Sequence, residues 1–391
     1  MRLTEKVGLE AHWLATLFAT LGLVPAFWLL HLPFRFAWGH FFSTYWISLT
    51  LQSVPVAVVL YLVGFPRLQT LGPLWEHYRA QKPRIVFLAL FATLMAWEFS
   101  PVTAAILIVV TVALLEVVDR TKGDFRVLFK WVSEVAAPAA YLFVGLVLVF
   151  SYNDVIAAVT YTGACDRAFL KMDSVILLGR SVSGISHVAL ARLGLPVFTV
   201  SEFVYYRMFA QIGAGLVITA LSLGKREALR YVGTMLTAYY FALIIFSIWP
   251  SMGPFFTCPS HFSEFPHSLI TYAAQSNFLA KARLLWNHGR IDQIGTDFYV
   301  AFPCMHIAQP LVVLWFLRRW KRMMLCLVIY DVLLIPSILL LEWHYVVDLI
   351  GGVGVAVLAI AVNYGWKEQE GLERPGLFAL LPATPPLPRE R

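Results

Sequence analysis

Long apolar runs alternate with short charged segments along most of this chain. The runs lie at residues 11–31, 41–64, 85–98, 102–118, 134–152, 199–222, 230–250, 303–317, 323–341 and 344–364. An α-helix needs about 20 apolar residues to cross the roughly 30 Å hydrocarbon core of a bilayer. The pattern therefore predicts an all-α fold, a polytopic membrane helical bundle with about ten transmembrane helices.

Lysine and arginine residues concentrate in every second segment between these runs, for example at residues 225–230 and 318–322. Loops rich in Lys and Arg remain in the cytoplasm, so ten crossings place both termini on the cytoplasmic side. The segments expected on the outer side are then 32–40, 153–198, 251–302 and the turn near Glu342.

The composition agrees with a membrane protein. Hydrophobic residues make up 59% of the chain and charged residues 14%, whereas soluble proteins contain about 25% charged residues. The net charge is +7, but the basic residues form no single patch, so we expect no nucleic-acid partner. Four cysteines without a CxxC motif indicate neither a zinc site nor a disulfide framework. A disulfide between Cys165 and Cys258 is left open.

The apolar runs and their flanks divide the chain into three parts. We predict N-terminal transmembrane helices in residues 1–133, a six-helix catalytic core in residues 134–364, and a disordered cytoplasmic tail in residues 365–391. The stretch 153–198 mixes apolar and polar residues, which indicates a helix in the membrane interface. This helix either lines the entrance for a lipid or is a packing element.

A proline and a histidine mark the start of one inward-running helix. The segment reads Phe302-Pro303-Cys304-Met305-His306, and proline suits the first helical turn because its missing N–H has no partner there. Free backbone N–H groups and the positive end of the helix dipole favour anions at such a terminus. His306 is therefore expected beside a phosphate.

A second histidine, His344, opens the last apolar run, four residues before Asp348. This spacing puts both side chains on one helix face, so the carboxylate can accept the ring N–H and fix the tautomer. The other ring nitrogen is then free to attack. Both helices run inward from the same surface, so we expect His306 and His344 to converge on one site.

An ordinary alternative is that these histidines are interfacial residues, like His31 or His40. A carboxylate within a membrane span costs about 2.5–3.5 kcal/mol on an insertion scale, so the pairing of His344 with Asp348 favours a function. Two histidines can supply a nucleophile and a proton for the leaving group. Phosphoryl transfer is the predicted chemistry.

Three segments carry a resemblance to a known family. Residues 289–292 (Gly-Arg-Ile-Asp), 302–306 and 344–352 resemble the inositol phosphorylceramide synthase branch of the type 2 phosphatidic acid phosphatase superfamily. The resemblance covers about residues 134–364 and implies a C-terminal six-helix phosphatidic acid phosphatase-like core.

The resemblance also implies roles for individual residues. His344 is the nucleophile that forms a phosphohistidine, Asp348 orients it, and His306 is the general acid and base. The implied chemistry uses no metal and no other cofactor.

The sequence departs from the superfamily's motifs at several points. Cys304-Met305 stands where the superfamily has Ser-Gly, and Ser337-Ile338 stands where it has Ser-Arg, so a phosphate-binding arginine is absent. Residues 249–254 occupy the place of the first motif. The synthase branch shows similar losses, which favours that branch over the phosphatases.

Another group must then neutralise the phosphate, because phosphoryl transfer depends chiefly on positioning and charge. Arg207 lies roughly 12 Å below the outer end of its predicted helix and faces either the site or a structural partner such as Glu202. Arg290 belongs to the matched Gly-Arg-Ile-Asp segment. The predicted substrate-binding residues are Arg207, Arg290 and Cys304.

The leading hypothesis is a membrane lipid phosphotransferase of sphingolipid metabolism. It moves a phosphorylated head group, such as phosphoinositol, from a phospholipid donor to a lipid alcohol acceptor on the periplasmic, extracellular or lumenal side. One alternative is a lipid phosphate or polyprenyl pyrophosphate phosphatase, in which water replaces the acceptor. Another is a non-catalytic transporter or assembly factor with the same fold. The head group, the acceptor and the oligomeric state are left open.

Overall fold

The structure, a computed structural model, describes residues 125–160, 164–257, 265–288 and 301–364. The four predicted spans before residue 125, the C-terminal tail, Cys258 and Arg290 lie outside these ranges. Predictions about them therefore stay predictions. The predicted domain boundary between residues 133 and 134 falls within the first described helix.

The described part of the chain is helical throughout and contains no strand. Its helices are α7 (Phe125–Thr160), α8 (Ala164–Ile176), α9 (Val182–Leu193), α10 (Leu195–Leu223), α11 (Lys225–Ile248), α12 (Pro254–Thr257), α14 (Ile270–His288), α15 (Met305–Leu317), α16 (Lys321–Leu340) and α17 (Val346–Tyr364). The six spans predicted between residues 134 and 364 coincide with α7, α10, α11, α15, α16 and α17. The all-α prediction is confirmed.

Four of these helices, α10, α11, α16 and α17, are long and apolar enough to cross a membrane. Helix α15 has 13 residues, a length of about 20 Å, whereas the 20 residues of α16 span about 30 Å. A short turn at residues 318–320 joins them. Helix α15 is therefore shorter than the helix that follows it.

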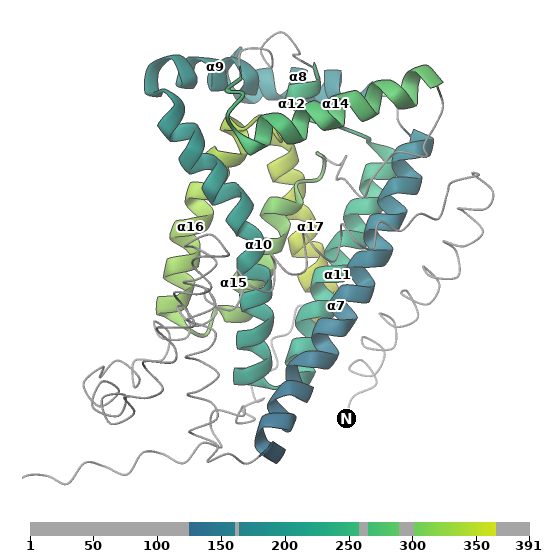
Figure 1. Ribbon diagram of the computed structural model, residues 1–391, viewed down its shortest axis with the longest axis vertical. Coiled ribbons are helices and arrows are strands. Elements are labelled where there is room, and N and C mark those ends of the chain that lie inside the picture. Colours follow the sequence, from purple (N-terminus) through teal and green to yellow (C-terminus); the bar gives the residue numbers. More distant parts are fainter. Residues whose placement is uncertain (1–124, 161–163, 258–264, 289–300, 365–391) are drawn as a thin grey trace, which may run out of the picture.

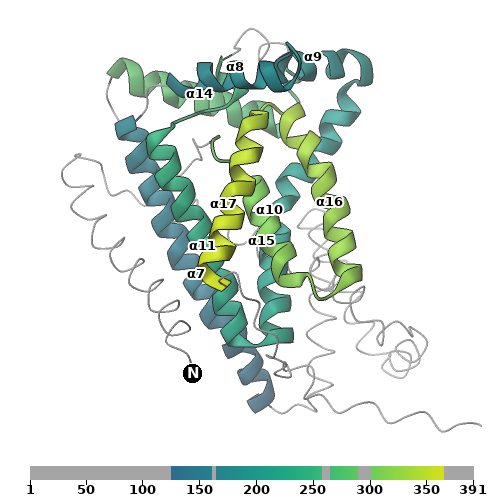
Figure 2. The same cartoon turned by 180° about the vertical axis from the view of Figure 1, so that it is seen from behind.

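Helix α11 lies at the centre of the bundle, packed against α7, α10, α15 and α17. Helices α8, α9, α12 and α14 lie across one end of the lengthwise helices, and both views show this arrangement (Figures 1 and 2). Helices α8 and α9 occupy the stretch for which an interfacial helix is predicted. They cover the end of the bundle at which α17 begins.

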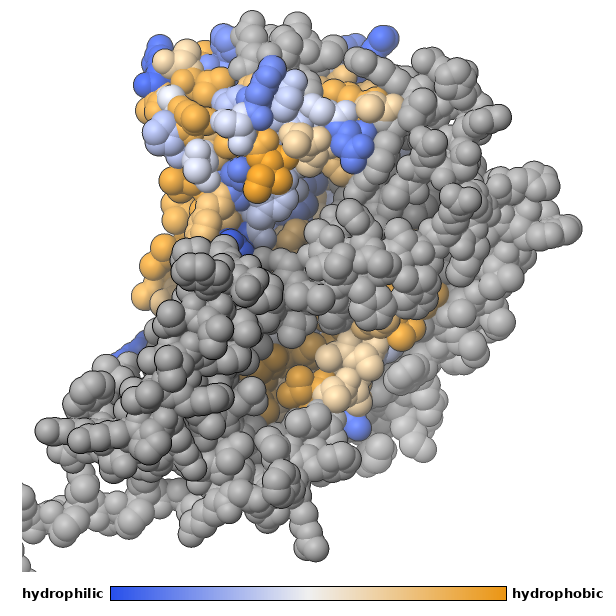
Figure 3. Space-filling view, in the orientation of Figure 1, coloured by the Kyte–Doolittle hydropathy of each residue, from blue (hydrophilic) through white to orange (hydrophobic). Residues whose placement is uncertain are grey.

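Exposed apolar side chains cover the outer surface of the lengthwise helices. On α16 they include Leu325, Ile329, Val332 and Leu333, which are 53–59% exposed. Figure 3 shows hydrophobic residues along the flank of the bundle and hydrophilic residues mixed among them at the covered end. So large an exposed apolar surface is unfavourable in water, whereas it is compatible with contact with lipid acyl chains. The bundle is thus a membrane protein, as predicted.

Candidate active site

The first turn of α15 is fixed against the start of α17. Cys304 is the N-cap residue of α15, and its backbone N–H donates a hydrogen bond to the carbonyl oxygen of Asp348 at 2.9 Å. Two residues further on, His306 projects from the first helical turn. The chain thus brings the two predicted motifs together at one point.

Glycines on α17 permit this close approach. A Cβ atom built on Gly352 would lie 2.3 Å from the carbonyl oxygen of Cys304, and one on Gly351 would lie 2.5 Å from the ring of Phe302. Any larger residue at position 352 would push the Cys304 backbone away from α17. Gly352 therefore sets the spacing between the two motifs.

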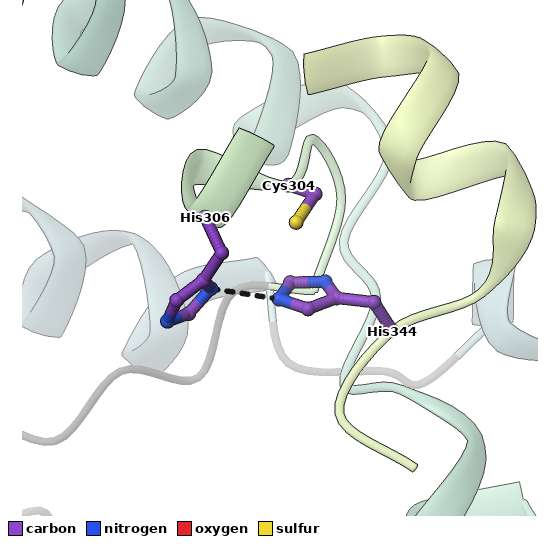
Figure 4. A group of neighbouring side chains, drawn as sticks. All are labelled: Cys304, His306 and His344. Carbon is purple, nitrogen blue, oxygen red and sulfur yellow. Dashed lines mark hydrogen bonds between the residues drawn. The ribbon is translucent and has the colours of Figure 1, made fainter. Parts of the chain in front are cut away.

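The two predicted catalytic histidines are in direct contact. Nδ1 of His306 and Nε2 of His344 are 3.1 Å apart, and Figure 4 shows the two rings facing each other beside Cys304. His344 is 2% exposed. The predicted convergence of these side chains is present in the structure.

The other nitrogen of His344 is held by the backbone. Its Nδ1 lies 2.8 Å from the carbonyl oxygen of Ala301 and 3.4 Å from Oδ2 of Asp348. A carbonyl oxygen only accepts hydrogen bonds, so Nδ1 of His344 carries the proton. In the neutral ring, Nε2 then has a free lone pair directed at His306.

Asp348 lies beside His344, as predicted, but His344 is two residues before the start of α17, so the two side chains do not share a helix face. Its Oδ2 atom also accepts the backbone N–H of Tyr345 at 2.8 Å, and the residue is fully buried. The closest acceptor for the ring N–H is nevertheless the Ala301 carbonyl. The orienting role predicted for Asp348 is shared with a backbone group that residue identity does not reveal.

Aromatic rings surround His306. The ring of Tyr205 stacks on it with centroids 4.5 Å apart, and Phe209 approaches it edge-on at 5.8 Å. Trp343 in turn stacks on Tyr205, with ring centroids 5.6 Å apart. The first two rings lie one turn apart on α10, which therefore presents an apolar wall to the histidine pair.

Two aspartates of α8 hold the loops around the site. Asp166 accepts hydrogen bonds from Ser251 Oγ at 3.0 Å and from the backbone N–H groups of Met252 at 3.0 Å and Gly253 at 2.9 Å. Asp173 accepts the N–H groups of Val346 and Val347, at 3.0 and 3.2 Å. Asp173 therefore caps the start of α17, where the helix dipole favours an anion.

Burial raises the pKa of each of these α8 carboxyl groups to about 6, although their backbone hydrogen bonds act in the opposite direction. Neither aspartate belongs to the sequence motifs that predict the site. Seven residues separate Asp166 from Asp173, which places them two turns apart on one face of α8. That periodicity is the signal that would have found them.

The three predicted substrate-binding residues have different outcomes. Cys304 is fully buried, and its Sγ lies within 4.8 Å of one ring nitrogen of each histidine. Arg290 lies outside the described residues.

Arg207 is placed over the ring of Phe203, 5.4 Å from its centroid. The residues of α10 that contact His306 are Tyr205 and Phe209, and a step of two residues turns a helix by about 200°. Arg207 therefore lies on another face of α10, and its placement gives no support to phosphate binding. Glu202, the structural partner considered for Arg207, accepts a hydrogen bond from the backbone N–H of Thr271.

An all-helical membrane bundle, in which two histidines and an aspartate meet at helix starts, defines a membrane protein with a histidine-based candidate active site. Residues 182–362, somewhat less than half of the chain, match the family model of the PAP2 superfamily, so this part of the chain is similar to that superfamily. Members of that superfamily are generally phosphatases or phosphotransferases. No curated protein and no solved structure matches the chain.

The close contact at Gly352 makes a stability prediction. Gly352→Ala should lower the free energy of unfolding by about 1–3 kcal/mol, because the new methyl group meets a backbone oxygen that cannot rotate away. Gly354→Ala is the matched control, since a Cβ there meets nothing within 4 Å. Thermal unfolding in detergent checks both, and equal midpoints for the two variants would contradict the proposed contact.

The raised pKa of Asp173 makes a pH prediction. Between its ordinary value of 3.8 and about 6, the folded protein binds more protons at this group than the unfolded chain, so stability falls as pH rises through that window. Asp173→Asn should make the slope of the unfolding midpoint against pH shallower there. Glu227→Gln, which removes a carboxylate salt-bridged to Arg230, is the charge control. An unchanged slope in Asp173→Asn would contradict the assignment.

Proposed function

We propose that this protein is a membrane lipid phosphotransferase that moves a phosphorylated head group from a phospholipid to a lipid alcohol. The observation that carries the proposal is the 3.1 Å contact between His306 and His344. The hydrogen bond from His344 Nδ1–H to the Ala301 carbonyl leaves the lone pair on His344 Nε2, and His306 can supply a proton. This is the arrangement that a covalent route through a phosphohistidine requires.

In the first step, Nε2 of His344 attacks the phosphorus atom of the donor lipid. The bond from phosphorus to the glycerol oxygen breaks, and that oxygen takes a proton from His306. Because the two rings are hydrogen-bond neighbours, the phosphate must enter between them and replace their contact. Diacylglycerol leaves, and the head group stays on His344.

In the second step, the hydroxyl group of a lipid alcohol loses its proton to His306 and attacks the phosphohistidine. The bond between nitrogen and phosphorus breaks, and His344 returns to its starting state. Its ring stays oriented throughout by Ala301 and Asp348. The same two histidines thus exchange the roles of acid and base between the steps.

The phosphate charge is met mainly by N–H groups in this proposal. Among the residues that the structure describes, neither histidine is hydrogen-bonded to a lysine or an arginine. The start of α15, with its backbone N–H groups and positive dipole end, lies beside His306. Arg290, which precedes α15 in the sequence and lies outside the described residues, is a further candidate.

The surroundings of His306 favour an alcohol over water as the acceptor. Tyr205 and Phe209 make one wall apolar, and a dry site protects a reactive intermediate from hydrolysis. The departures from the phosphatase motifs at Cys304 and Ser337 support the inositol phosphorylceramide synthase branch, and with it a phosphoinositol head group. A phosphatase is the second candidate.

The orientation in the membrane is part of the proposal. The basic residues of the turn between α15 and α16, at 318–322, lie at the opposite end of α15 from His306. Basic turns face the cytoplasm, so the histidine pair faces the periplasmic, extracellular or lumenal side.

The reaction is tested with the purified protein in liposomes that contain labelled phosphatidylinositol and a ceramide. The expected result is a new phosphoinositol lipid, formed in equal amount with diacylglycerol. Release of water-soluble inositol phosphate or phosphate, without a new lipid, would reject transfer and leave a phosphatase. Absence of any turnover across a panel of donors and acceptors would favour a transporter or assembly factor.

Substitutions of the two histidines test the assigned roles. His344→Ala should lower the rate on the order of 10⁴-fold or more, since nucleophile and base act as a unit, and His306→Ala should lower it about 10²–10⁴-fold. His187→Ala, at an exposed histidine of α9, is the control and should keep the rate. Wild-type activity in a folded His344→Ala variant would remove the mechanism.

A further inference from the structure

Three side chains with metal-binding atoms meet at the candidate active site. Cys304 Sγ and one ring nitrogen each of His306 and His344 all lie within 4.8 Å of one another, and Figure 4 shows the three side chains gathered at one point. We propose that this triad binds a thiophilic divalent cation, of which Zn²⁺ is the best fit, and that the bound ion blocks the site. The binding part stands by itself, and the blocking part rests on the proposed function.

The geometry is close to that of a tetrahedral zinc site. Bond lengths of about 2.0–2.1 Å to nitrogen and 2.3 Å to sulfur require about 3.4 Å between two nitrogens and about 3.6 Å between sulfur and nitrogen. The two histidine nitrogens are already 3.1 Å apart. The sulfur needs to approach by no more than about 1 Å, within the reach of a χ1 rotation.

The thiol is available for this role. Cys304 is the N-cap residue of α15, yet its side chain makes no capping hydrogen bond. Its backbone is held by the bond to Asp348 and by the close approach of Gly352. The position of the Cys304 Cβ atom is therefore set by the fold, and only the side-chain torsion that places the sulfur has to adjust.

The groups behind His344 complete the site. Its Nδ1–H donates to Ala301, with Asp348 behind it, which is how metal-bound histidines are usually oriented. Nε2 is thereby left with a lone pair for the ion. On binding, the Cys304 thiol gives its proton to the buffer and becomes a thiolate ligand. A water molecule or a phosphate oxygen can take the fourth position.

Catalysis and metal binding exclude each other in this arrangement. The lone pair that would coordinate the ion is the one that attacks phosphorus in the proposed reaction. The ion would also fill the space between the histidines into which the phosphate must enter. Zn²⁺ should therefore inhibit turnover, in competition with the phospholipid donor.

Binding is measured with Co²⁺, which fits tetrahedral sites and gives a thiolate charge-transfer band when sulfur is a ligand. The protein is the full chain, free of any histidine tag, in detergent micelles. Cys165, Cys258 and Cys326 are replaced by alanine, so that Cys304 is the single thiol. The expected result is one Co²⁺ per chain with a thiolate band, and displacement of that Co²⁺ by Zn²⁺.

Matched variants in the same background assign the ligands. Cys304→Ala should abolish the thiolate band, and Cys304→Ser, which keeps the side-chain size, should do the same. His306→Ala and His344→Ala should each weaken Co²⁺ binding by about 100-fold or more. Loss of a group that only orients a ligand costs about 10–100-fold, and loss of the ligand itself should cost at least as much. The His187→Ala variant should bind as the parent does.

Two results would overturn the metal site. One is the absence of a thiolate band at saturating Co²⁺ in the folded parent protein, and the other is a Co²⁺ affinity that stays unchanged in both His306→Ala and His344→Ala. These readouts need no turnover, so failure of the proposed reaction leaves them intact. Conversely, full activity in the presence of bound Zn²⁺ would refute only the blocking part.

Discussion

The hydrogen bond from the Cys304 N–H group to the Asp348 carbonyl joins two helix starts that lie far apart in the sequence. It brings the first turn of α15 onto the first turn of α17, and Gly352 provides the space. The histidine pair exists because this backbone contact exists. His306 lies in the first turn of α15, and His344 lies two residues before α17 begins, so the contact between these two helix starts sets the distance between the rings.

Buried carboxylates hold the surrounding chain in place. Asp166 accepts hydrogen bonds from the backbone N–H groups of Met252 and Gly253, and Asp173 caps the start of α17. Burying a carboxylate is unfavourable unless its oxygens accept hydrogen bonds, and here the acceptors meet backbone donors that would otherwise be unpaired. The helix that covers the end of the bundle therefore determines the shape of the loops beside the histidines.

The lengthwise helices and the proximity of the two histidines were predictable for simple reasons. Apolar runs of membrane length identify α10, α11, α16 and α17, and the i, i+4 spacing identifies His344 with Asp348. The Ala301 carbonyl was not predictable, because backbone acceptors carry no signature in the sequence. Arg207 is predicted to bind phosphate because of its depth along α10, but depth does not specify which face of the helix a residue occupies.

The different lengths of α15 and α16 have a consequence for how a lipid reaches the site. The two helices are joined by a short turn at one end, and α16 is longer by about 10 Å, so α15 stops well before the rim at which α16 ends. His306, in the first turn of α15, consequently lies deeper along the bundle than the end of α16. Under the proposed function, a phosphate-bearing head group would have to pass the helices that cover this end of the bundle before it reaches the histidine pair.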